Sequence, residues 1–219
     1  MMWKQAIFLT LCLAQTALAK EKTQPVVKLA VYKIDTAKSK VNWVGKKSFV
    51  EGYNHHGTID ISGEVSCEGD IAKAADIAIN MLSIKNLDIT KKEDNAKLIG
   101  HLESKDFFDV HGSEANKTAH LKIESIDVAK KMANGQLTIR GVTKPIQITL
   151  TKVTVKDGIA EAEGSAMFNR RDYGVNYSSV EDGMLDKAVG LAKDKIIDNN
   201  IAITFTVHAV KVQAAQAKK

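Results

Sequence analysis

Cysteine, proline and aromatic residues are scarce in this sequence, and each scarcity excludes a class of protein. The 219 residues include two cysteines and two prolines, and aromatic residues make up 5%. Cys12 lies in an N-terminal run that we expect to be removed, so only Cys67 remains and an internal disulfide is excluded. The basic residues are scattered and lack aromatic neighbours, which argues against a nucleic-acid partner. Stability must therefore come from apolar burial and backbone pairing.

Long apolar runs are also missing, apart from a short one at the N-terminus. Residues 1–19, MMWKQAIFLTLCLAQTALA, combine Lys4 with an apolar run that begins at Ala6 and a small-residue ending at Ala19. This pattern predicts a secretory signal peptide, and the run is too short to span a membrane. Cleavage near Ala19 would leave 200 residues (219 minus 19) in the periplasm or outside the cell. Removal of Lys4 would lower the net charge from +5 to +4 (5 minus 1).

The remaining chain divides into three parts. We expect a short linker at residues 20–30, one all-β domain at residues 31–212, and a polar tail at residues 213–219. No fixed-period repeat and no second domain are indicated, since about 200 residues suit one all-β domain.

Most of the domain alternates between apolar and polar residues, which is typical of a strand with one dry face. In NGQLTIRGVTKPIQITL, residues 134–150, the apolar residues share one face on either side of a turn. About eight or nine such runs occur without an alternating β-α pattern, which predicts an antiparallel all-β fold. The residues in phase with these dry faces are our candidates for lining the interior: Trp43, Ile59, Ile61, Val65, Ile77, Ile79, Met81, Leu121, Ile123, Leu137, Ile139, Ile146, Ile148, Leu150, Ala160, Ala162, Gly164, Ala166, Phe168, Ile203 and Phe205.

One helical insertion interrupts the strands. Thr90 followed by Glu93 predicts a capping box, in which the two side chains bond the first turn of a helix. Leu98, Ile99 and Leu102 then form an apolar stripe at helical spacing. The sequence therefore predicts a helix that starts near Thr90 and covers part of the fold.

Glycine dipeptides mark the expected tight turns. Asn134–Gly135 and Asp157–Gly158 both predict tight turns between strands. Residues 178–200 form a less regular segment, with a possible short amphipathic helix, which we interpret as a loop or lid.

The interior of such a fold can be filled or open. Strands with one dry face pack as a sandwich or close into a barrel, and an eight-stranded barrel either fills with side chains or holds a small ligand. Ala160, Ala162, Gly164 and Ala166 follow one another on the same face and fill an interior poorly. Either bulky side chains such as Phe205 cover them, or they border a cavity.

Catalytic motifs are absent from the sequence. It contains no G-x-S-x-G, H-E-x-x-H, P-loop or dinucleotide-binding glycine pattern. His55 and His56 are adjacent, and adjacent strand residues point to opposite faces, so the pair predicts a surface loop and no metal site. We therefore predict no catalytic residue, no metal and no cofactor, and a protein that is not an enzyme.

One polar stretch breaks the alternation. FNRRDYGVNY, residues 168–177, is either a surface turn with a local arginine–aspartate pair or the polar mouth of a cavity. In the second interpretation Arg170, Arg171 and Tyr173 are candidate contacts for an anionic or hydroxylated headgroup.

Four stretches together resemble the YceI family. They are YKIDTAKSKVNWVGKK (32–47), LIGHLESKDFFDV (98–110), LTIRGVTKPI (137–146) and FNRRDYGVNY (168–177), and the resemblance runs from Tyr32 to Val210. It implies an exported, lipocalin-like antiparallel β-barrel of about eight strands, without enzyme activity, that holds a polyisoprenoid, an isoprenoid quinone or a fatty-acid-type lipid. The stretch VHGSEANKTAHL departs from the family pattern, so that loop is unusual here.

The working hypothesis is an exported carrier or sequestering protein for such a lipid, in a role related to stress. Its partner is an amphiphilic lipid, without nucleic acid and without stable membrane insertion, and the sequence leaves monomer and homodimer open. Two alternatives stay open as well: a filled barrel that acts through its surface, and an enzyme acting on a lipid or quinone with His55 or His111 at the mouth.

Overall fold

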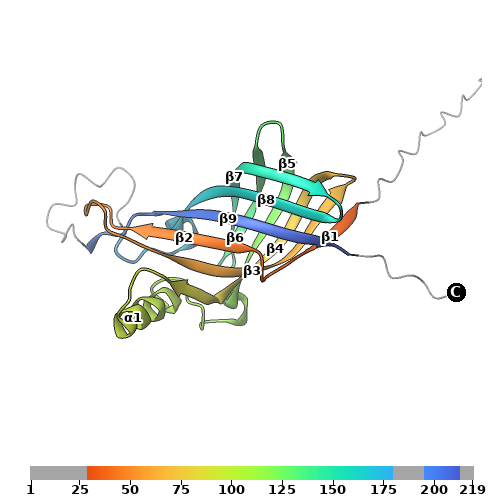
Figure 1. Ribbon diagram of the computed structural model, residues 1–219. Coiled ribbons are helices and arrows are strands. Elements are labelled where there is room, and N and C mark those ends of the chain that lie inside the picture. Colours follow the sequence, from red (N-terminus) through yellow and green to blue (C-terminus); the bar gives the residue numbers. More distant parts are fainter. Residues whose placement is uncertain (1–28, 180–194, 213–219) are drawn as a thin grey trace, which may run out of the picture.

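Nine antiparallel strands and one α-helix make up the part of the chain that the computed structural model describes, residues 29–179 and 195–212 (Figure 1). The strands are β1 (Ala30–Ile34), β2 (Lys40–Lys46), β3 (Asn54–Glu68), β4 (Ile71–Asn86), β5 (Thr118–Asp127), β6 (Met132–Ile139), β7 (Val142–Lys156), β8 (Ile159–Asn169) and β9 (Asn200–Lys211). The helices are α1 (Lys92–Glu103) and two short 3₁₀ turns, η1 (Glu114–Lys117) and η2 (Arg170–Tyr173). The predicted signal peptide, most of the linker, the 213–219 tail and most of the predicted lid lie outside the described residues.

The sheet closes on itself. Each strand from β3 to β9 pairs with the next, and β9 pairs with β2, which returns to β3. β1 and β2 share one position in this ring, because both lie between β3 and β9 at different heights. The result is a closed eight-stranded antiparallel barrel with one helical insertion, which confirms the predicted lipocalin-like fold.

Side-chain alternation explains which face turns inward. In β6 and β7, Leu137, Ile139, Ile146, Ile148 and Leu150 are buried, as the period-two pattern predicts. Two-residue turns join β6 to β7 and β7 to β8, and all four turn residues have positive φ: Arg140 52°, Gly141 74°, Asp157 51° and Gly158 77°. This type I′ geometry matches the twist of the flanking strands. The predicted turn at Asp157–Gly158 is therefore confirmed.

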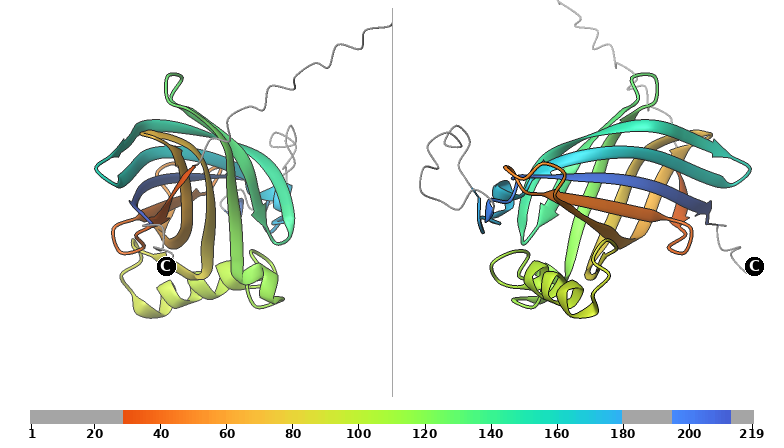
Figure 2. Two further views of the ribbon diagram at one scale, coloured as in Figure 1. Left: turned by 90° about the vertical axis from the view of Figure 1, so that its right-hand side faces the viewer. Right: turned by 60° about the vertical axis from the view of Figure 1, so that its left-hand side comes forward.

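The α1 helix and the short turn η2 lie near one end of the barrel, which we call the α1 end. In this chain β2, β4, β6 and β8 finish there, and β3, β5, β7 and β9 begin there. Figure 2 shows the helix beneath the ends of the strands, away from the C-terminal end of β9. The opposite end carries the hairpin between β7 and β8.

Two local predictions are wrong, and one strand was missed. The predicted capping box of Thr90 and Glu93 does not form: the N-cap is Lys91, with no side-chain cap bond. The Asn95 side chain instead donates to the carbonyl of Ile89 (2.9 Å) ahead of the helix. Asn134–Gly135 lies inside β6, paired with β5, and the turn falls at residues 128–131, where Lys131 has φ 55°. The strand β1 was not predicted, since it is five residues long and completes the position that β2 occupies only in part.

Candidate functional site

A cavity of about 480 Å³ occupies the inside of the barrel. Its wall consists of the inward faces of the strands together with one side of α1. Every residue that the alternation nominated lines this cavity except Gly164. The volume lies within the range of small-molecule sites, and the wall is almost entirely apolar. The interior is therefore open, and the interpretation as a filled barrel is wrong.

Gly164 is separated from the cavity by an aromatic ring. A Cβ added at this position would lie 2.8 Å from the ring of Phe205 and 2.3 Å from the carbonyl oxygen of Thr149. The ring of Phe205 itself lines the cavity. A bulky side chain thus covers one member of the small-residue series, while Ala160, Ala162 and Ala166 remain at the wall.

The cavity extends along the barrel. Val155, Ala160 and Val207 line it toward the hairpin between β7 and β8, and Leu98 and Leu102 of α1 line it at the α1 end. An elongated apolar space of this kind suits a chain better than a compact polar metabolite, because contact with the wall is apolar along its length.

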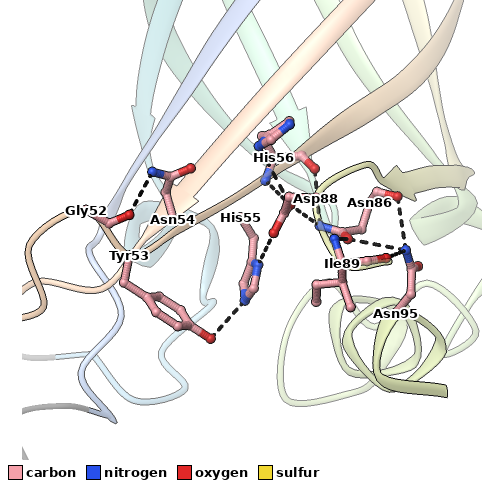
Figure 3. A network of polar contacts seen from close by, with 9 residues as sticks. All are labelled: Gly52, Tyr53, Asn54, His55, His56, Asn86, Asp88, Ile89 and Asn95. Atoms are coloured by element: carbon pink, nitrogen blue, oxygen red, sulfur yellow. Dashed lines mark hydrogen bonds and ion pairs between the residues drawn. The ribbon is translucent and has the colours of Figure 1, made fainter. Parts of the chain in front are cut away.

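Polar side chains reach the cavity at the α1 end, where the chain from β2 to β3 meets the link from β4 to α1 (Figure 3). The Tyr53 hydroxyl lies 3.1 Å from Nε2 of His55, and Nδ1 of His55 lies 2.7 Å from a carboxylate oxygen of Asp88. Tyr53 and His55 both line the cavity, and Tyr53 is 41% exposed. The cavity therefore reaches the surface here.

The Asp88 carboxylate accepts several of the hydrogen bonds in this network. Its other oxygen accepts hydrogen bonds from the backbone N–H of His56 (2.8 Å) and from the side chain of Asn86 (2.6 Å). Partial burial on its own would raise the pKa of Asp88, but the hydrogen bonds from His55, His56 and Asn86 outweigh it and lower the pKa to about 2. The carboxylate is thus charged at any physiological pH and orients the His55 ring.

Two lysines at the same end differ in their surroundings. Lys46 forms an ion pair with Asp198, with 3.4 Å between nitrogen and oxygen. The ammonium group of Lys47 lies 4.2 Å from the centre of the Tyr53 ring. Both lysines border the cavity, which places positive charge at its opening.

The predicted headgroup residues form η2 at this same end of the barrel, but they do not line the cavity. Arg170 is fully buried, and its guanidinium donates to the carbonyls of Asp198 (3.0 Å), Val175 (2.9 Å) and Ile197 (3.1 Å). Burial lowers the pKa of Arg170 to about 10, with a further contribution from Arg171, so the group remains protonated at neutral pH.

Tyr173 packs edge-on against Phe168, with 5.6 Å between ring centres, and burial raises its pKa to about 12. Neither Arg170, Arg171 nor Tyr173 lines the cavity. The prediction that these residues contact a headgroup finds no support in this placement, because Arg170 instead joins the end of β8 to the start of β9.

The sequence did not identify the residues at the α1 end as a site. His55 was interpreted as part of a surface loop, and the aromatic rings of Tyr53, Phe107 and Tyr177 were not assigned to the interior. The one available signal was the concentration of Lys, Tyr and His in residues 46–56, but only closure of the barrel brings that segment beside Asp88.

Among the described residues of the cavity wall, two buried polar atoms have no hydrogen-bond partner. They are Nε1 of Trp43 and Nε2 of His101, and both are covered by surrounding protein atoms. The His101 ring lies edge-on to Tyr177, with 4.5 Å between ring centres, and to Phe107, with 5.6 Å. Enclosure of an unpaired nitrogen is unfavourable, so both positions reduce stability relative to an apolar ring of the same shape.

Residues 29–179 and 195–212 contain no cluster of three or more His, Cys, Asp or Glu side chains suited to a metal ion. His111, named above as a candidate at the mouth, instead pairs with Glu103 at 3.1 Å and does not border the cavity. In the same part of the chain, no helix is both long and apolar enough to cross a membrane.

Comparison with known proteins supports the fold and identifies relatives. The YceI-like domain family matches residues 32–209. A crystal structure of BcnA from Burkholderia cenocepacia is 20% identical, with a TM-score of 0.57. The match covers 81% of this chain and 99% of BcnA. A polyisoprenoid-binding domain from Saccharophagus degradans, implicated in plant cell wall breakdown, is 16% identical with a TM-score of 0.57, covering 84% of this chain and all of that one (100%). None of the curated proteins matches the sequence.

Proposed function

Because the chain belongs to the YceI-like family, we propose that it holds an amphiphilic lipid, an isoprenoid or a related chain, in the cavity of its barrel. The observation that supports this proposal most directly is the elongated apolar cavity of about 480 Å³. The Saccharophagus degradans domain, which shares the fold, is described as polyisoprenoid-binding. Polyisoprenoids, isoprenoid quinones and fatty-acid-type lipids are the ligand classes that this cavity suits.

Apolar burial alone provides enough free energy for such a ligand. Burial contributes roughly 0.8 kcal/mol for each CH₂-sized group, so about fifteen buried carbons contribute on the order of 12 kcal/mol. The loss of ligand freedom then opposes binding by several kcal/mol. Few polar contacts are needed, and a wall of this kind accepts more than one chain type.

The proposed role is that of an exported carrier or sequestering protein, acting in the periplasm or outside the cell. The signal-peptide pattern of residues 1–19 supports export. A binding role without catalysis is supported by the wall, whose inward faces carry alanine, valine, leucine, isoleucine and aromatic side chains along most of its length.

One observation favours a second candidate, an enzyme acting on a lipid or quinone. Tyr53, His55 and Asp88 form a chain of hydrogen bonds at the cavity opening, in the order hydroxyl, imidazole and carboxylate. This order resembles a nucleophile with its base, although a tyrosine hydroxyl is a weak nucleophile. Turnover of a lipid or quinone that His55→Ala abolishes would support this candidate over a binding protein.

Identification of the co-purified ligand tests the proposal. The full-length gene is expressed with its natural N-terminus, the protein is purified from the export compartment, and its mass is measured under native conditions before and after solvent extraction. We expect an added mass that corresponds to a chain lipid. A ligand-free mass that stays unchanged after incubation with prenols and fatty acids would contradict the proposal.

A further inference from the structure

We propose that Lys47 and Tyr53 form a binding site for a negatively charged end group, a carboxylate or a phosphate, on the lipid that the barrel holds. This inference rests on the proposed function, because it assigns the polar end of the same ligand. An ionised end group cannot enter the apolar interior at acceptable cost, so it must stay where the cavity reaches solvent. The α1 end is such a place, since Tyr53 both lines the cavity and is exposed.

The backbone holds the two side chains together before any ligand arrives. The N–H of Lys47 donates to the carbonyl of Tyr53 (3.2 Å), and this bond closes the loop of residues 48–52. The N–H of Ser48 donates to the carbonyl of Ile196 (2.9 Å), which ties the loop to the segment before β9. Less ordering is then required when the ligand binds, which favours affinity.

The Tyr53 hydroxyl is oriented by the network behind it. His55 contacts this hydroxyl through Nε2 and is itself held by Asp88 through Nδ1 (Figure 3). Because Nδ1–H of His55 donates to the Asp88 carboxylate, the ring is held with Nε2 beside the Tyr53 hydroxyl, and the O–H can rotate from this nitrogen to a ligand oxygen. His55 and Asp88 are therefore positioning residues, and Tyr53 is the contact.

The charge comes from Lys47. Its ammonium group lies over the Tyr53 ring, and within the described parts of the chain it has no carboxylate partner within 4 Å. The neighbouring Lys46 is already paired with Asp198. An oxyanion beside Tyr53 would therefore meet one cation and one O–H donor on adjacent groups, a combination that makes charge-assisted hydrogen bonds.

Matched ligands distinguish this inference from the function on which it rests. Myristate and tetradecanol share a chain and differ in charge, and geranylgeranyl monophosphate and geranylgeraniol form a second pair. Native mass spectrometry titrations of the full chain should give a dissociation constant about fivefold lower for the charged member of a pair, as expected for a partly exposed charge-assisted bond. The advantage should shrink at high salt, because exposed charges are screened. A preference confined to one pair would show whether the end group is a carboxylate or a phosphate.

Three variants complete the test. Lys47→Gln should remove the preference, so that the charged and the neutral member of a pair bind with equal affinity. Tyr53→Phe should reduce the preference while keeping the ring beneath Lys47. Lys156→Gln is the matched control, since it removes one positive charge at the opposite end of the barrel. Equal affinities within both ligand pairs, or an equal loss in Lys156→Gln, would overturn the inference alone. Failure of all four ligands to bind would overturn the proposed function and the inference together.

Discussion

Filling the cavity from its wall should weaken ligand binding strongly without unfolding the barrel. Ala166 on β8 lines the cavity, opposite Ile148 and Ile203 on the neighbouring strands. Ala166→Phe adds six ring carbons to this wall. If the ring displaces about four ligand carbons, at roughly 0.8 kcal/mol each, binding weakens by about 3 kcal/mol, or on the order of 100-fold.

The next residue along the strand provides the matched control. Met167 is 61% exposed and points away from the cavity, so Met167→Phe adds an aromatic ring to the outside of the same strand. Its dissociation constant for the same ligand should equal that of the original protein. Ala162→Phe is expected to behave like Ala166→Phe, because Ala162 lies on the same wall.

The assay pairs native mass spectrometry titration with a prenol against thermal unfolding of the ligand-free protein. The added ring enters existing space, so the ligand-free Ala166→Phe protein should lose less than about 1.5 kcal/mol of stability, below the usual cost of overfilling a packed core. A folded Ala166→Phe protein that binds the prenol within threefold of the original would refute the assignment of this cavity as the ligand site.

Three further predictions concern stability. The pKa of Asp88 is about 2 in the folded protein against 3.8 ordinarily, so its ionised carboxylate stabilises the folded state above pH 4, and this stabilisation is lost as the pH falls through 2. The melting temperature should therefore fall less between pH 5 and 2 in Asp88→Asn than in the original protein. Arg170→Met leaves three carbonyls without their donor and should lower the free energy of unfolding in urea by about 3 kcal/mol, and Arg170→Lys should restore little of it because one ammonium cannot replace the planar fork. His101→Phe removes an enclosed, unpaired nitrogen from a ring held between two aromatic neighbours and should raise the free energy of unfolding by about 1 kcal/mol, whereas His101→Ala should lower it.

The wall of the cavity was predictable from sequence because it depends on a local property. In a strand the side chains alternate with a period of two, so once Leu137 faces inward, Ile139 does as well. The hairpin geometry then continues the phase into Ile146 and Ile148. Gly164 is the exception that shows the limit, since its cover, Phe205, comes from a strand that lies beside it only after folding.

The opening of the cavity was not predictable in the same way. Tyr53 and His55 lie where β3 begins, and Asp88 lies 33 residues after His55 in the link to α1. No periodicity relates these positions, because they meet only when β3 pairs with β4 along its whole length. At Thr90 the local capping motif also misled: the helix has Lys91 as its N-cap, and the side chain that bonds across the helix start is that of Asn95.

Arg170 shows why a charged break in a strand pattern is ambiguous evidence. At the α1 end the chain leaves the sheet after β8 and re-enters at β9, and the carbonyls of residues 175, 197 and 198 do not find partners in a strand ladder. A buried guanidinium supplies several N–H donors in one plane and satisfies all three. An arginine at such a point is therefore explained equally well by an anionic ligand or by unpaired carbonyls of the chain itself. Here three backbone acceptors are left over where the strands end, and Arg170 donates to all three, so this arginine is explained by the chain itself.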